Sequence, residues 1–125
     1  AEIVREVYTI EIIPPLADSA RNLLRDMGYK NVQVKTGNGY LGWPEHAPFD
    51  AIVVTAAPDE VPQALVEQLA VNGRMVIPVG TFNQQMMIIT RSSQGIVERK
   101  TFPVRFVPMT GKPKICGAAS MAEAR

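Results

Sequence analysis

The sequence has little cysteine, little histidine and no excess of charge of either sign. One cysteine among 125 residues, Cys116, excludes an intrachain disulfide framework. Cys116 also has no histidine or cysteine nearby in the sequence, so we expect neither a metal site nor a nucleophile there. The single histidine, His46, lies in a polar, proline-flanked stretch and is predicted to be a solvated loop residue. With 13 Lys and Arg against 12 Asp and Glu, nothing indicates a nucleic-acid partner.

Long apolar runs and glycine-rich nucleotide loops are also missing. The longest apolar stretch, around residues 51–57, is far shorter than the ~20 residues that span a bilayer, so we expect no membrane partner. The low cysteine content favours a cytoplasmic protein. Neither G-x-G-x-x-G nor a P-loop occurs. The start, AEIVREVYTI, has neither an initiator Met nor a signal-peptide layout, so we expect the chain to be a piece of something longer.

The first part of the sequence alternates between strand and helix patterns. Residues 7–12 (VYTIEI) are rich in β-formers and residues 32–36 (VQVKT) alternate, so both are predicted strands. Between them, a one-faced helix that ends at Gly28 is predicted from apolar residues at helical spacing: Leu16, Ala20, Leu23, Leu24 and Met27.

Residues 51–55 (AIVVT) are apolar on both faces, which is typical of the buried centre of a parallel sheet. A second helix is predicted after them, capped by Asp59 and closed by Asn72-Gly73. Its apolar stripe is Val61, Leu65 and Leu69. Residues 75–79 (MVIPV) then form another short strand, with Pro78 near its exit.

The remaining pattern is antiparallel. Residues 84–91 and 96–102 are strand-like and joined by Ser-Ser-Gln-Gly, which predicts a hairpin. Residues 104–109 are extended. The order of elements predicts an α/β sheet with helices on both faces. We expect one domain over residues 1–111 and a loose tail over residues 112–125.

Three segments follow predicted strands, where α/β proteins bind ligands. Glu11 ends the first strand, and its two carboxylate oxygens suit the hydroxyls of a ribose; a plain surface carboxylate is the alternative. Gly37-Asn38-Gly39 allows a ligand to approach the backbone, or is a simple turn. Thr55 and Ala56 leave room at a strand exit, or serve close packing.

Several phrases together resemble one family. VYTIEI, GNGYLGWPEHAPFDAIVVTAAPDEVP, NGRMVIPVG and PVRFVPMTG are similar, in order and spacing, to protein-L-isoaspartate O-methyltransferases. The resemblance covers residues 1–111. It implies a partial Rossmann-like class I methyltransferase sheet that uses S-adenosyl-L-methionine. The implied activity is methylation of the α-carboxylate of L-isoaspartyl residues in damaged proteins, the first step of their repair.

The resemblance also implies site residues. Glu11 matches the acidic residue that holds the cofactor's ribose, and Ile12 a position that packs on its adenine. Gly37, Asn38 and Gly39 match a Gly-Asp-Gly segment at the adenine end, where the amide oxygen of Asn38 replaces a carboxylate. Thr55 and Ala56 match the strand end that lines the methionine side of the cofactor. The segment that helps wall the substrate site is matched by Val107, Pro108 and Met109.

The family's glycine-rich loop, first strand and catalytic serine have no counterpart in the sequence. The missing strand would lie between the strands at 7–12 and 51–55. We therefore expect weak cofactor binding by this chain alone, and either marginal stability or self-association through exposed strand edges. A non-catalytic α/β module that pairs with another chain is the main alternative; a dinucleotide-binding oxidoreductase is disfavoured by the absent glycine fingerprint.

Overall fold

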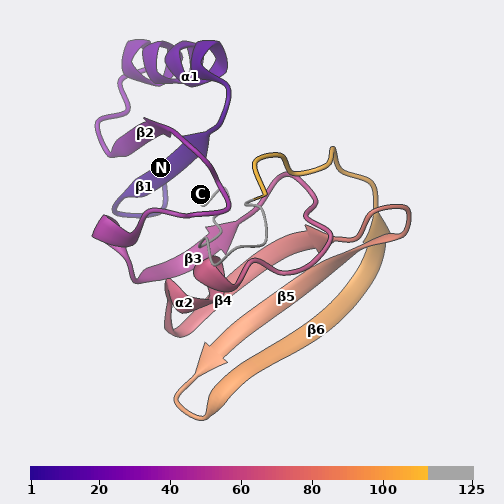
Figure 1. Cartoon of the computed structure of the whole chain (residues 1–125). Helices are drawn as coiled ribbons and strands as arrows, with labels where there is room; N and C mark the ends of the chain where they lie inside the picture. The colour runs from indigo at the N-terminus through magenta and orange to yellow at the C-terminus, as the bar shows by residue number, and fades with distance from the viewer. Residues whose placement is uncertain (113–125) are drawn as a thin grey trace.

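The computed structural model describes residues 1–112 and contains six strands and three helices, including one short 3₁₀ helix (Figure 1). In chain order these are β1 (Val7–Glu11), α1 (Pro14–Asp26), β2 (Val32–Thr36), η1 (Pro44–His46), β3 (Phe49–Val53), α2 (Gln63–Glu67), β4 (Leu69–Val79), β5 (Gln84–Ser92) and β6 (Gly95–Val104). Except for Lys112, the predicted C-terminal tail lies outside the described residues.

The strands form two hydrogen-bonded sheets. β1 and β2 pair in parallel, with Tyr8 opposite Gln33 and Ile10 opposite Lys35. β3, β4, β5 and β6 form the second sheet in that order; β3 and β4 are parallel, and the other pairs are antiparallel. This arrangement confirms the predicted α/β class, the antiparallel hairpin and the interruption of the sheet between the first strand and β3.

Helix α1 packs on the two-stranded sheet through a face that overlaps the predicted one only in part. Pro14 and Pro15 open the helix, where their missing N–H groups cost nothing. Ala17 is fully buried, whereas Leu16, Leu23 and Met27 are each more than half exposed. The predicted stripe is therefore confirmed only in part: Ala20 and Leu24 are partly buried, on the same side as Ala17, while Leu16, Leu23 and Met27 are exposed.

Strand β3 begins and ends two residues earlier than predicted, and it is buried on one face only. Ile52 and Val54 are buried against the core, while Ala51 and Val53 alternate to an exposed face. The expectation of burial on both faces is thus wrong in the described residues. The reason is that the core cluster, which includes Leu65 and Val66 of α2, packs on one face of the four-stranded sheet.

The second helix is shorter than predicted. It starts after Pro62, not at Asp59, and ends at Glu67. Leu69 already belongs to β4, and it pairs with Phe49 of β3. Asn72-Gly73 does not close the helix but lies within β4, where the positive φ of Asn72 (69°) accommodates an irregularity in the pairing with β3.

The main core is formed by one face of the four-stranded sheet and α2. Its buried residues are Ile52, Val54, Leu65, Val66, Leu69, Met75, Ile77, Met87 and Ile89. Pro78 lies near the exit of β4, as predicted, opposite Met86. No helix within residues 1–112 is both long and apolar enough to cross a membrane.

Candidate functional site

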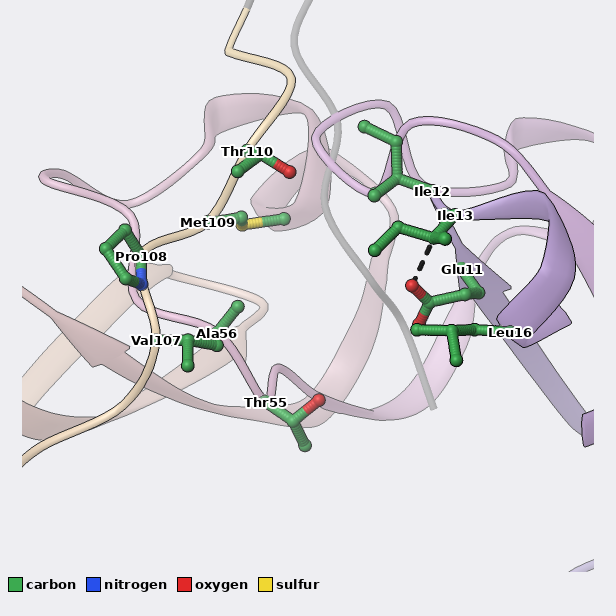
Figure 2. Close-up of a pocket in the computed structure, with 11 residues that line it drawn as sticks. Glu11, Ile12, Ile13, Leu16, Thr55, Ala56, Val107, Pro108, Met109 and Thr110 are labelled. Atoms are coloured by element: carbon green, nitrogen blue, oxygen red, sulfur yellow. Dashed lines mark hydrogen bonds between the residues drawn. The ribbon is translucent and has the colours of Figure 1, made fainter.

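A pocket of about 330 Å³ lies where β1 and β3 end (Figure 2). One side comes from the end of β1 and the start of α1, and the other from the residues after β3 and from the segment before Gly111. The lining residues are Glu11, Ile12, Ile13, Leu16, Gly39, Thr55, Ala56, Val107, Pro108, Met109 and Thr110. The structure therefore brings together every predicted site residue except Gly37 and Asn38.

Glu11 is the only ionisable side chain among these lining residues. Its Oε1 atom accepts a hydrogen bond from the backbone N–H of Ile13 at 3.3 Å, which fixes the carboxylate at the strand end (Figure 2). The residue is half-buried, so the carboxylate remains accessible from the pocket. Such a group is suited to accept hydrogen bonds from a diol.

Residues 107–112, which we call the strap, cross the end of β3. The backbone N–H of Ala57 donates to the carbonyl of Val107 at 2.8 Å, and the N–H of Met109 donates to the carbonyl of Ala57 at 2.9 Å. Ala57 and Pro108 thereby form a parallel β-bridge. This bridge holds Val107, Pro108 and Met109 at the wall of the pocket.

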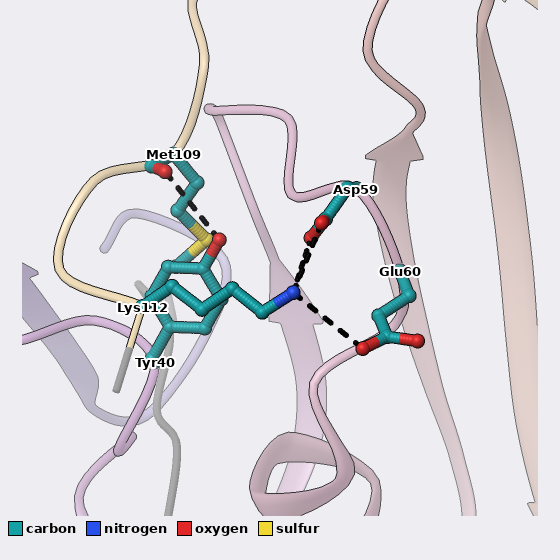
Figure 3. A network of polar contacts seen from close by, with 5 residues as sticks. All are labelled: Tyr40, Asp59, Glu60, Met109 and Lys112. Carbon is teal, nitrogen blue, oxygen red and sulfur yellow. Dashed lines mark hydrogen bonds and ion pairs between the residues drawn. The ribbon is translucent and has the colours of Figure 1, made fainter. Parts of the chain in front are cut away.

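Lys112 fastens the far end of the strap (Figure 3). Its Nζ atom lies 2.9 Å from Oδ2 of Asp59 and 3.6 Å from Oε1 of Glu60. The hydrogen bond from Lys112 lowers the pKa of Asp59. The hydroxyl of Tyr40 donates to the carbonyl of Met109 at 3.4 Å, and burial raises the pKa of that hydroxyl.

Asn38 does not line this pocket. Its Oδ1 atom accepts the backbone N–H of Tyr40 at 2.9 Å, and its Nδ2 atom donates to the carbonyl of Gly111 at 2.5 Å. Gly37 is likewise outside the lining; its N–H donates to the carbonyl of Glu11 at 3.0 Å. Both residues thus support the residues around the pocket through hydrogen bonds, of which the bond between Asn38 and Gly111 is long-range in the sequence.

Gly111 lies against two of the predicted adenine positions. It has a φ of +91°, and a Cβ atom there would lie 2.8 Å from both the Oδ1 atom of Asn38 and the Cδ1 atom of Ile12. Glycine therefore permits both the backbone conformation and the close approach. The end of the strap is fitted to Ile12 and Asn38 in this structure.

Three lining residues were not predicted: Ile13, Leu16 and Thr110. The sequence pattern places Leu16 in the packing stripe of α1, yet its position in the first turn directs it to the pocket (Figure 2). Thr110 lies in the phrase PVRFVPMTG, directly after three predicted residues, so its position was the available signal. The contact of Asp59 with Lys112 spans 53 residues, and no local pattern indicates it.

His46 is exposed, as predicted, but it is not an isolated loop residue. Its ring stacks on Tyr8 of β1 with centroids 4.3 Å apart, and it lies 5.0 Å from the ring of Trp43. Tyr8 also lies 5.8 Å from Phe49 at the start of β3. No group of three or more potential metal ligands occurs in the part of the chain that the structure describes, which leaves out Cys116.

These features define an α/β protein with a ligand pocket at the carboxyl ends of its parallel strands. The family model for protein-L-isoaspartate(D-aspartate) O-methyltransferase matches residues 1–114. The chain belongs to this family.

Curated relatives agree with this assignment. The chain is 61% identical over 112 residues to a protein-L-isoaspartate O-methyltransferase of Gloeobacter violaceus, covering 88% of this chain and 55% of that protein. It is 51% identical to the enzyme of that name from a Picosynechococcus species, covering 89% of this chain and 50% of the relative. The chain therefore spans about half the length of the curated relatives it matches.

Solved structures show the same relationship. A protein-L-isoaspartate O-methyltransferase superposes with a TM-score of 0.79 at 28% identity, over 85% of this chain and 34% of the other. A Plasmodium falciparum β-aspartate methyltransferase, solved in complex with S-adenosyl-L-homocysteine, gives a TM-score of 0.72 at 31% identity, over 84% and 52%. The two sheets of the present structure are thus arranged as in longer members of the family.

Proposed function

We propose that this chain takes part in methyl transfer from S-adenosyl-L-methionine to the α-carboxylate of L-isoaspartyl residues in damaged proteins. The observation that carries the proposal is the pocket, which joins Glu11 at the end of β1 to Thr55 and Ala56 after β3. Membership of the family supports the same reaction. We further propose that the protein acts in the cytoplasm on isoaspartyl-containing proteins and peptides.

The residues of the pocket fit one part of the cofactor. Glu11 would accept hydrogen bonds from the ribose hydroxyls, and the apolar side chain of Ile12 would lie against the adenine. Bound S-adenosyl-L-methionine would supply a sulfonium methyl group for transfer. Asn38 fits less well than the resemblance implies, because its amide already bonds Gly111 and Tyr40.

The side chains around the pocket suit a reaction that needs positioning more than acid–base catalysis. A peptide α-carboxylate is ionised at neutral pH, so it can attack a methyl group without losing a proton. Holding the reacting groups in line then supplies most of the rate enhancement. Val107, Pro108 and Met109, fixed by the bridge to Ala57, would wall the side of the pocket on which the substrate lies.

The test combines this chain with the part of the Gloeobacter violaceus relative that it does not match. We expect the mixture to transfer labelled methyl groups to an isoaspartyl peptide and not to the same peptide with a normal aspartyl residue. Glu11→Gln should weaken S-adenosyl-L-methionine binding by about 10-fold to 100-fold, as loss of hydrogen bonds to a charged group does. Equal labelling of both peptides would contradict the proposed substrate.

Glu98→Gln is the matched control, because Glu98 is an exposed glutamate on β6 and does not line the pocket. It should leave cofactor affinity unchanged. For the chain alone we predict weak or no binding of S-adenosyl-L-methionine, since the family's glycine-rich loop, with its backbone donors, has no counterpart in it. Calorimetric detection of micromolar affinity by the isolated chain would overturn that prediction.

A further inference from the structure

Strand β4 contains a stretch that is in register with neither neighbouring strand. β4 pairs with β3 at Leu69 and next at Arg74, and its pairing with β5 begins at Arg74. Over this interval β3 advances by two residues, from Phe49 to Ala51, while β4 advances by five. Residues 70–73, which we call the bulge, are therefore left out of the register in the part of the chain that the structure describes.

The backbone of the bulge selects both of its last two residues. Asn72 has a φ of 69°, a left-handed conformation that asparagine tolerates better than most side chains do. Gly73 is buried, and a Cβ atom there would lie 2.8 Å from the carbonyl oxygen of Ala70 and 3.1 Å from that of Asp50. Any larger residue would have to displace these main-chain atoms. The fold thus favours the dipeptide Asn-Gly at this point of the chain.

The same dipeptide is open to an intramolecular reaction, because glycine has no side chain to shield its main-chain nitrogen. In that reaction the nitrogen of Gly73 attacks Cγ of Asn72, and the new bond closes a five-membered imide. The bond from Cγ to the side-chain nitrogen breaks, and ammonia leaves with the proton from the glycine nitrogen. Water then opens the imide. Hydrolysis at the α-carbonyl gives an isoaspartyl residue, and hydrolysis at Cγ gives an aspartyl residue.

The chain has a second Asn-Gly dipeptide, Asn38-Gly39, but there the side chain is held in place. Its Oδ1 atom accepts the N–H of Tyr40 at 2.9 Å, and its Nδ2 atom donates to the carbonyl of Gly111 at 2.5 Å. Both bonds have to break before Cγ can turn toward the nitrogen of Gly39. Asn72, in contrast, is exposed, and its side chain makes no hydrogen bond within residues 1–112.

We propose that Asn72 is a site of spontaneous modification, at which the folded chain loses ammonia and acquires an isoaspartyl or aspartyl residue through the imide. An isoaspartyl residue adds one carbon to the main chain. The bulge absorbs this carbon, because no pair of the β3–β4 or β4–β5 register has to move. The modified chain therefore keeps its fold and gains one negative charge. The inference rests on backbone chemistry and not on the proposed function.

The test incubates the full chain in mildly alkaline buffer, where the glycine nitrogen loses its proton more readily, and follows each asparagine by peptide mapping. Electron-transfer fragmentation separates the isoaspartyl from the aspartyl product. We expect Asn72 to convert roughly 10-fold faster than Asn38, the factor that two ordinary hydrogen bonds contribute. In concentrated urea the two residues should convert at similar rates, since the contacts that hold Asn38 are then lost.

Asn72→Gly is the informative variant, because glycine keeps the positive φ and has no amide to lose. It should abolish the fast conversion and leave the slow conversion of Asn38 unchanged. Asn83→Gly is the matched control, since Asn83 is also exposed but is followed by Gln84. It should leave the conversion of Asn72 unchanged. The modified parent chain, separated by its charge, should keep its cooperative thermal transition.

Three results would overturn the inference. One is that Asn38 converts as fast as Asn72 in the folded chain. Another is that Asn72 converts in urea but not in the folded chain, which would mean that β4 shields the nitrogen of Gly73. The third is that the modified chain loses its cooperative transition, which would show that the bulge does not absorb the added carbon.

Discussion

The unit formed by β3 to β6 with α2 has a core of its own, whereas the unit formed by β1, α1 and β2 does not. The first buries nine apolar residues in one cluster. The second buries Ile10 and Ala17 fully and leaves Leu16, Leu23 and Met27 more than half exposed. Apolar burial is the main favourable term in folding, so the first unit should persist under conditions that open the second.

Polar and aromatic contacts are among those that tie the two units together. The side chain of Gln68 accepts the N–H of Trp43 and donates to the carbonyl of Leu41, each at 2.9 Å. This fixes the loop between β2 and β3 to the end of α2. Gly42, with a φ of +61°, leaves room for that side chain. Stability therefore comes mainly from the unit of β3 to β6 with α2. A few residues, such as Gln68, couple the other unit to it.

The largest effect on stability is expected when the same substitution is made at one leucine of each helix. Leu65 of α2 is fully buried, whereas Leu23 of α1 is 60% exposed. Leu65→Ala should lower the free energy of unfolding by about 2–5 kcal/mol, because it leaves a cavity in the core. Leu23→Ala should change it by less than about 0.5 kcal/mol. Urea unfolding of both variants tests the comparison, and equal losses would contradict it.

A smaller loss of stability is expected when either of two buried glutamines is replaced. Each of them holds a different segment of the chain. Gln68→Met leaves Trp43 N–H and Leu41 C=O without their partner and should cost about 1–3 kcal/mol. Exchange of the Trp43 amide should accelerate, while that of Phe106 should not.

Gln84→Met is the matched control, since Gln84 exchanges two hydrogen bonds with the backbone of Phe106 at 2.6 and 3.0 Å. It should have a similar cost and accelerate exchange at Phe106 instead of Trp43. Acceleration at both sites in either variant would mean that the two units are more tightly coupled than the contacts indicate.

Local patterns in the sequence predicted most of the strands, because each strand carries its own β-forming residues and turn signals. They failed around Leu69, which extends the spacing of Val61 and Leu65 and so fits a helical stripe as well as the start of a strand. Pairing with Phe49, twenty residues earlier in the chain, decides in favour of β4. Asn72-Gly73 was misassigned for the same reason: a positive φ serves a strand irregularity as well as a helix end.

The candidate site was predictable where residues follow strands and carry a family pattern, as Glu11, Thr55 and Ala56 do. The strap is different, because its attachment depends on long-range pairs such as Asn38 with Gly111 and Asp59 with Lys112. The apolar stripe of α1 predicted a covered face correctly only in part. A periodic pattern identifies a face that is suited to burial, but what covers it is decided elsewhere in the fold.

The smallest effect on stability is expected from the ion pair that fastens the strap. The hydrogen bond from Lys112 lowers the folded-state pKa of Asp59 below its ordinary 3.8, although burial opposes it slightly. A lowered pKa stabilises the folded state above the ordinary aspartate range, and this contribution is lost as the pH falls through the folded-state value. Because both side chains are more than 40% exposed, solvent screens the pair and its contribution to stability is small.

Lys112→Met should therefore raise the pKa of Asp59 toward 3.8, as measured by NMR titration of its carboxyl carbon. It should also accelerate amide exchange at Met109 above pH 5, where the parent strap is fastened. Lys100→Met, at an exposed lysine on β6, is the control and should change neither quantity. An unchanged Asp59 pKa in the Lys112 variant would show that the bridge at Ala57, and not the ion pair, holds the strap against the pocket.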